Sequence, residues 1–175
     1  MFLRGRQHES TVWQRFHPAR DGFTVRHLDG VVEVLVRSNA ERVVDLFLAL
    51  AEELPPAVSI FIDDVRSSTR FTGAELALPD VLEAVGRLKL PLTTYAGAEI
   101  SIFSPDEQVT LTPSLELYLH SVSERWVFLL RGHGLVERAS LAQRSWRLLR
   151  DGFPSAPEAT QALRLAAARL GLVSS

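Results

Sequence analysis

Residues 23–37, "FTVRHLDGVVEVLVR", decide the start of the fold. Asp29 and Gly30 interrupt two runs of alternating apolar and polar residues, and both accept the positive φ that a two-residue type I′ turn requires. Folding about this turn sets Val25 opposite Val34 and Arg26 opposite Glu33. One face of the hairpin then collects the apolar side chains and the other carries an ion pair, so this stretch predicts an antiparallel hairpin.

A helix and a buried strand are predicted directly after the hairpin. Ser38 and Glu41 have the spacing of a capping box, apolar residues recur at helical period up to Leu54, and Pro55 and Pro56 end the pattern. The unbroken run "AVSIFI" at 57–62 then reads as a central strand. Because strand, helix and strand make a crossover unit, we expect this strand to run parallel to the second hairpin strand, within a mixed sheet.

The rest of the chain predicts an antiparallel extension and more helices. A short helix is expected between Pro79 and Pro91, followed by strands near 92–96, 98–103, 107–112 and 115–120. Residues 121–131 fit either a strand or a helix, and the spacing of Ser121 and Glu124 favours the helix. Helices are also expected at 137–150 and 157–170. The prediction is one α+β domain over 1–175, with a mixed sheet begun by an N-terminal hairpin, helices packed on that sheet, a possible arm at 1–20 and a two-helix C-terminal tail at 137–175.

Composition excludes several kinds of chemistry. The chain has no cysteine, which removes thiolate catalysis, disulfides and cysteine-ligated zinc or iron–sulfur sites. It contains no serine elbow, P-loop or dinucleotide-binding glycine pattern. No window reaches the roughly 18 apolar residues of a membrane span, and the first residues offer no signal-peptide core. We therefore expect a soluble, cytoplasmic protein with no membrane partner and no cofactor.

The clearest candidate for chemistry is "SIFIDDVRSSTRFTG" at 59–73, where Asp63 and Asp64 follow the predicted central strand. Two carboxylates can hold Mg²⁺, and Arg66 and Arg70 can bind phosphate oxygens, which together suit phosphoryl or nucleotidyl transfer. Adjacent residues of an extended strand, however, point to opposite faces. We therefore favour a polar loop at the end of the strand and keep the Mg²⁺-dependent enzyme as the alternative.

"FIDDVRSSTRF" resembles the first metal-binding strand of class III nucleotidyl cyclases. The resemblance covers some ten residues and implies that Asp64 carries the metal. That family places a second aspartate on a downstream hairpin between glycines. The corresponding stretch here, "YAGAEISIF", has Gly97 and Ala98 at those positions, and Glu99 is the nearest carboxylate.

His133, between Gly132 and Gly134, is a second candidate catalytic residue. A flexible glycine-flanked histidine suits acid–base chemistry. The same residues also suit the end of a helix, where glycine takes the left-handed conformation and a cationic side chain meets the carbonyl end of the helix dipole. We favour the helix end.

Charge is unevenly distributed, because residues 31–123 are acidic and both ends are basic. With no assembled catalytic set, the favoured function is a non-enzymatic protein-binding or adaptor protein, including the inhibitor and immunity types, whose acidic middle attracts a protein partner. Nucleic-acid binding through arginines of the C-terminal tail is a further alternative. The candidate partner contacts are Glu41, Asp45, Glu52, Trp13 and Phe16, and the candidate nucleic-acid contacts are Arg138, Arg144, Arg147, Arg150, Arg164 and Arg169.

Overall fold

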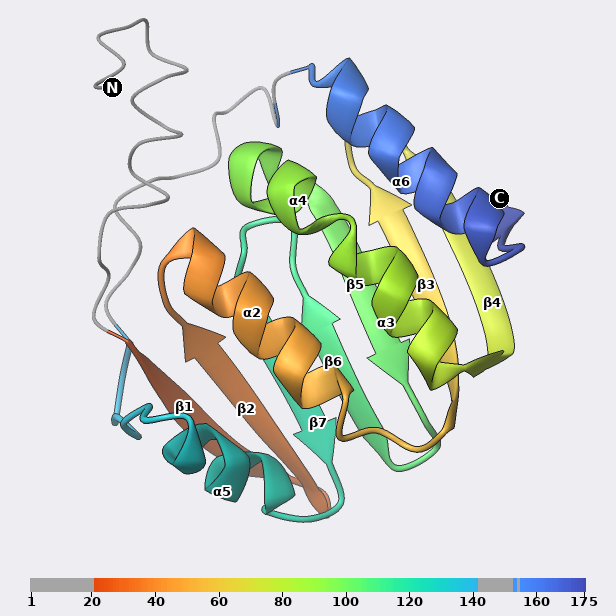
Figure 1. The fold of residues 1–175 in the computed structure, drawn as a ribbon. Coiled ribbons are helices and arrows are strands. Elements are labelled where there is room, and N and C mark those ends of the chain that lie inside the picture. Colours follow the sequence, from red (N-terminus) through yellow and green to blue (C-terminus); the bar gives the residue numbers. More distant parts are fainter. Residues whose placement is uncertain (1–20, 142–152, 154) are drawn as a thin grey trace, which may run out of the picture.

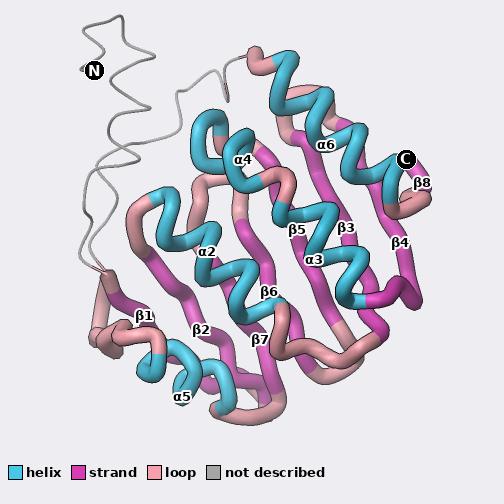
Figure 2. Tube along the Cα trace, in the orientation of Figure 1, coloured by secondary structure: helices cyan, strands magenta, loops and turns pink. Residues whose placement is uncertain are grey.

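The computed structural model describes residues 21–141, 153 and 155–175. It contains one eight-stranded sheet in the order β1-β2-β7-β6-β5-β3-β4-β8. The helices lie on one face of this sheet (Figures 1 and 2), which confirms the predicted α+β class. The strands are β1 Gly22–Leu28, β2 Val31–Arg37, β3 Ala57–Asp64, β4 Thr69–Ala77, β5 Ala98–Phe103, β6 Glu107–Leu111, β7 Leu117–Ser121 and β8 Val173–Ser174. The helices are α2 Ala40–Ala51, α3 Leu78–Gly86, α4 Lys89–Tyr95, α5 Arg125–Gly132 and α6 Pro157–Arg169.

The predicted hairpin is confirmed in its register. Val25 pairs with Val34 and Arg26 with Glu33, and Arg26 Nη1 lies 3.9 Å from Glu33 Oε1. Asp29 and Gly30 both have positive φ, 47° and 83°, as the type I′ turn requires. The local sequence therefore determines this part of the sheet.

The sheet itself is antiparallel, and the prediction of a mixed sheet is wrong. Counting the antiparallel pairs across the sheet shows that β3 runs in the same direction as β2, but β7, β6 and β5 lie between them. The sequence therefore predicted the direction of β3 relative to β2 correctly and its neighbouring strand wrongly. Among the named strands every pairing is antiparallel, and Phe23 with Glu137 forms an isolated parallel bridge.

Two local predictions also need correction. Residues 92–96 were expected to be a strand, but α4 continues to Tyr95 because Pro91 lies in its first turn, where a missing N–H costs nothing. Residues 65–73 were expected to be a loop. They instead form the turn of the β3–β4 hairpin and the first half of β4, with Asp64 paired to Thr69 where the turn begins.

The helices at the end of the chain are partly confirmed. Residues 125–132 are helical, as predicted, and α6 matches the helix expected at 157–170. The first turn expected at 137–150 is absent from residues 137–141, and the remainder of that predicted helix lies outside the described residues. Among the helices of the described ranges, none has the length and apolar content needed to cross a membrane.

The core lies between the sheet and the helices. Helix α2 buries Val43, Phe47 and Leu50 against it. The N-cap of α2 is Asn39, whose side chain accepts a hydrogen bond of 2.9 Å from the Arg42 amide, while Ser38 donates to Asp21. The capping residue is therefore one position later than the sequence pattern suggested.

Candidate functional site

Asp63 and Asp64 lie on opposite faces of β3. Asp64 points to the helix side, with a relative exposure of 1%, and Asp63 points to the face that carries no described helix, where it pairs with Arg70. The strand alternation that argued against a shared site is therefore observed. The two carboxylates do not converge on one ligand.

The Asp64 carboxylate is held by three donors from the protein. The Arg66 amide donates to Oδ1 at 3.1 Å, and the Ser67 and Thr160 hydroxyls donate to Oδ2 at 2.8 and 2.7 Å. Ser67 belongs to the β3–β4 turn and Thr160 to the first turns of α6. We call this set the Asp64 junction, because it fastens the turn to the helix.

Arg66 extends the Asp64 junction to α4. Its guanidinium donates to Ala96 O at 2.7 Å and Tyr95 O at 2.5 Å, which are carbonyls at the C-terminal end of α4, where a cation is favoured by the helix dipole. Burial lowers the pKa of Arg66, and the nearby Asp64 charge opposes that shift. Gly97, with φ 75°, leaves the room that the guanidinium occupies.

The arrangement does not reproduce the cyclase-like metal pair. Ala98 pairs with Asp64 across β3 and β5, and Glu99 pairs with Asp63, so the nearest carboxylate downstream faces away from Asp64. In the described part of the chain, no three His, Asp, Glu or Cys side chains gather as metal ligands do. In the described structure the Asp64 carboxylate accepts hydrogen bonds from Arg66, Ser67 and Thr160.

On the other face, Asp63 and Arg70 form an exposed ion pair over an aromatic ring. Arg70 Nε donates to Asp63 Oδ1 at 2.7 Å and Nη2 donates to Oδ2, while Cζ lies 5.2 Å from the Phe61 ring centroid. The hydrogen bond to Asp63 raises the pKa of Arg70. Burial raises the pKa of the neighbouring Glu99, and the Asp63 charge adds to this shift.

The sheet face that carries no described helix, which we call the uncovered face, is the larger candidate site. One row of paired residues crosses five strands, from Phe61 through Ser101, Thr110 and Tyr118 to Leu35. The Ser101 and Thr110 hydroxyls lie 2.8 Å apart, and Gln108 Nε2 donates to both at 2.9 Å. Strand alternation places seven charged residues on this face, and the irregular part of β4 adds Glu75, so carboxylates outnumber guanidinium groups. The seven are Arg26, Glu33, Arg37, Asp63, Arg70, Glu99 and Glu116.

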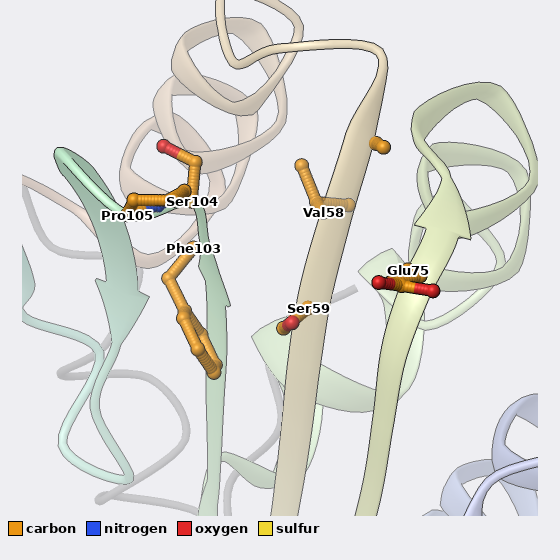
Figure 3. A pocket seen from close by; sticks show the side chains of 7 residues that line it. Val58, Ser59, Glu75, Phe103, Ser104 and Pro105 are labelled. Atoms are coloured by element: carbon orange, nitrogen blue, oxygen red, sulfur yellow. The ribbon is translucent and has the colours of Figure 1, made fainter.

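A groove of about 320 Å³ opens at one end of this face. Figure 3 shows Ser59 of β3 between Phe103 of β5 and Glu75 of β4. These residues were not among those predicted from the sequence. The signal was present in "AVSIFIDD" and "AEISIF", because the alternation that buries Ile60 and Ile102 sends the residues beside them to the opposite face.

The other predicted site residues lie elsewhere. His133 is the C-cap of α5, as the helix-end interpretation expected, and its carbonyl accepts from Arg42 Nη2 at 3.0 Å. Glu41, Asp45 and Glu52 are exposed on or beside α2, and Lys89 Nζ lies 2.5 Å from Asp45 Oδ1.

The arginines of the predicted nucleic-acid surface are not gathered by the described structure. Arg169 pairs with Glu83 at 2.6 Å, Arg138 Nε donates to Asp21 O at 3.3 Å, and Arg164 is exposed on α6. Several of the other predicted contacts lie outside the described residues, namely Trp13, Phe16, Arg144, Arg147 and Arg150.

The chain matches no family model, no curated protein and no solved structure in comparisons with known proteins.

Proposed function

We propose that this chain is a non-enzymatic protein-binding module that docks a partner protein on the uncovered face of its sheet. The observation that carries the proposal is the one-sided architecture: the described helices cover one face of the sheet (Figure 1), and the other face presents half-buried large side chains. Apolar and aromatic groups flanked by charged residues are typical of interfaces. These groups are Leu35, Phe61, Phe103 and Tyr118.

The charge of this face favours a basic partner. Its carboxylates outnumber its guanidinium groups, and complementary charge chiefly speeds and orients encounter. The acidic side of α2 is a weaker candidate docking surface than the sequence suggested, because Lys89 already pairs with Asp45. The hydrogen bond to Asp45 raises the pKa of Lys89. The uncovered sheet is the better docking surface because it combines apolar area with charge.

Site-specific photo-cross-linking tests where a partner docks. A photoreactive phenylalanine analogue replaces Tyr118 on the uncovered face in one variant and Glu52 beside α2 in another, and both are irradiated in lysate of the source organism. We expect a discrete protein adduct at 118 that is lost on Leu35→Arg, which places a charge in the same row. An adduct at 52 alone would move the interface to the acidic helix, and no adduct at either position would contradict a protein-binding function.

A further inference from the structure

The groove is built by a large, a small and an acidic residue side by side. Ser59 pairs with Phe103 on one side, and on the other side the β3–β4 register shifts between Val58 and Ile60, which leaves Glu75 in the bulge opposite Ser59. Neighbouring strands lie about 4.8 Å apart, so Phe103 and Glu75 face each other across roughly 10 Å with only a serine below. The remaining lining residues are Ala57, Val58, Ser104 and Pro105.

Glu75 is an unusual residue for this position. It has φ 54°, a left-handed conformation that costs a non-glycine residue on the order of 1 kcal/mol. Its side chain is exposed, and no described residue pairs with its carboxylate. The bulge therefore places at the edge of the groove a strained acid that no described residue pairs with, where glycine would be the less strained residue.

The same face contains a filled example of this arrangement. Phe61 and Asp63 hold the Arg70 guanidinium, which lies over the ring and donates two hydrogen bonds to the carboxylate. The Phe103 ring lies 6.4 Å from the Phe61 ring at an interplanar angle of 54°. Phe103 with Glu75 thus repeats the combination of aromatic ring and carboxylate, without a cation from any described residue.

We propose that the groove formed by Ser59, Glu75, Phe103 and Ser104 is a subsite for one arginine side chain of the protein partner, an inference that rests on the proposed function. The guanidinium lies against the Phe103 ring and donates to the Glu75 carboxylate. A planar guanidinium suits this site because it stacks on aromatic rings and donates two parallel hydrogen bonds to a carboxylate.

An apolar side chain fits the groove less well. It would cover the Glu75 carboxylate without supplying a donor, and a desolvated unpaired charge is costly. The Ser59 hydroxyl at the floor of the groove adds acceptor lone pairs that a guanidinium can use and an alkyl chain cannot. Charge and hydrogen-bonding capacity therefore both select arginine.

The test is an NMR titration of the ¹⁵N-labelled full chain with N-acetyl-arginine amide. The matched probe is N-acetyl-citrulline amide, which keeps the shape of arginine and removes its charge. We expect saturable amide shifts at Ser59, Glu75 and Ser104 with a Kd in the millimolar range for so small a ligand, and no saturable shifts with citrulline. Glu75→Gln should weaken binding roughly fivefold, as expected for loss of one ion pair.

Asp80→Asn is the matched control, because it removes an exposed carboxylate from α3, away from the groove, and should leave the Kd unchanged. Ser59→Val, which raises the floor of the groove, is a second test that leaves Glu75 in place and should also abolish the shifts. Equal shifts with citrulline, or an unchanged Kd for Glu75→Gln in a folded variant, would overturn the proposal.

The two proposals fail separately. A photo-adduct at position 118 without an arginine response refutes the arginine subsite and leaves the docking face supported. A saturable arginine response at the groove, with no photo-adduct at 118, supports the subsite and refutes docking of a partner across the whole face.

Discussion

Replacing Asp64 tests whether this carboxylate is a structural acceptor. Asp64→Ala leaves the Ser67 and Thr160 hydroxyls and the Arg66 amide without their acceptor in a site that is 1% exposed. Hydrogen bonds to a charged acceptor contribute about 1.5–3 kcal/mol each, and three around one carboxylate are not additive. We expect a loss of about 3–4 kcal/mol in the free energy of unfolding, a large part of the 5–15 kcal/mol typical of a domain.

Urea unfolding followed by tryptophan fluorescence, to which buried Trp126 contributes, and by circular dichroism measures this loss. Thr160→Val removes one donor and should cost about 1–2 kcal/mol. In the Asp64→Ala background, Thr160→Val should cost about 1 kcal/mol less than in the unchanged chain, because the two residues share one hydrogen bond. A loss below 1 kcal/mol for Asp64→Ala would refute the structural role. Stabilisation of the unchanged chain by Mg²⁺ that disappears in Asp64→Asn would instead support the metal-dependent alternative.

Three further changes test neighbouring features. Gly97→Ala should destabilise the fold by about 2 kcal/mol or more in urea unfolding, since φ is 75° and the added Cβ would lie 2.6 Å from Arg66 Cζ. Glu75→Gly should increase the free energy of unfolding by about 1 kcal/mol and so raise the thermal midpoint, because it removes the left-handed strain at this residue. A lowered midpoint would contradict this. Glu99→Gln should stabilise the chain at pH 7 and not at pH 4. Folding raises the pKa of Glu99 through burial and then through Asp63, so the native state binds its proton more tightly and stability falls as pH rises through the interval above about 4.3. Urea midpoints that respond equally to Glu99→Gln at both pH values would contradict this assignment.

The sequence predicted those elements whose determinants are local. The β1–β2 hairpin follows from Asp29-Gly30 and the alternation around it, and α2 follows from helical periodicity ended by two prolines. Helix α5 was recognised from the same periodicity, although its apolar run also suited a strand. Each of these elements contains its own start, stop and buried face.

Strand adjacency and the groove were not predictable from local patterns. Nothing within 57–64 indicates that β5, rather than β2, is its neighbour, because that pairing depends on strands made later in the chain. Strand β4 was missed because the bulge at Glu75 breaks the alternation on which strand prediction depends. The opposite orientations of Asp63 and Asp64 were predicted, since they follow from strand geometry alone.

The strand order also determines when the sheet can assemble during synthesis. Strand β2 hydrogen-bonds to β7, so everything between Arg37 and Leu117 must leave the ribosome before the first hairpin can join the rest of the sheet. Contacts between residues so far apart in the chain form slowly, and an unjoined hairpin exposes apolar surface and a free edge. The nascent chain therefore passes through a stage in which the hairpin edge is unpaired, and a pause in translation before β7 lengthens that stage.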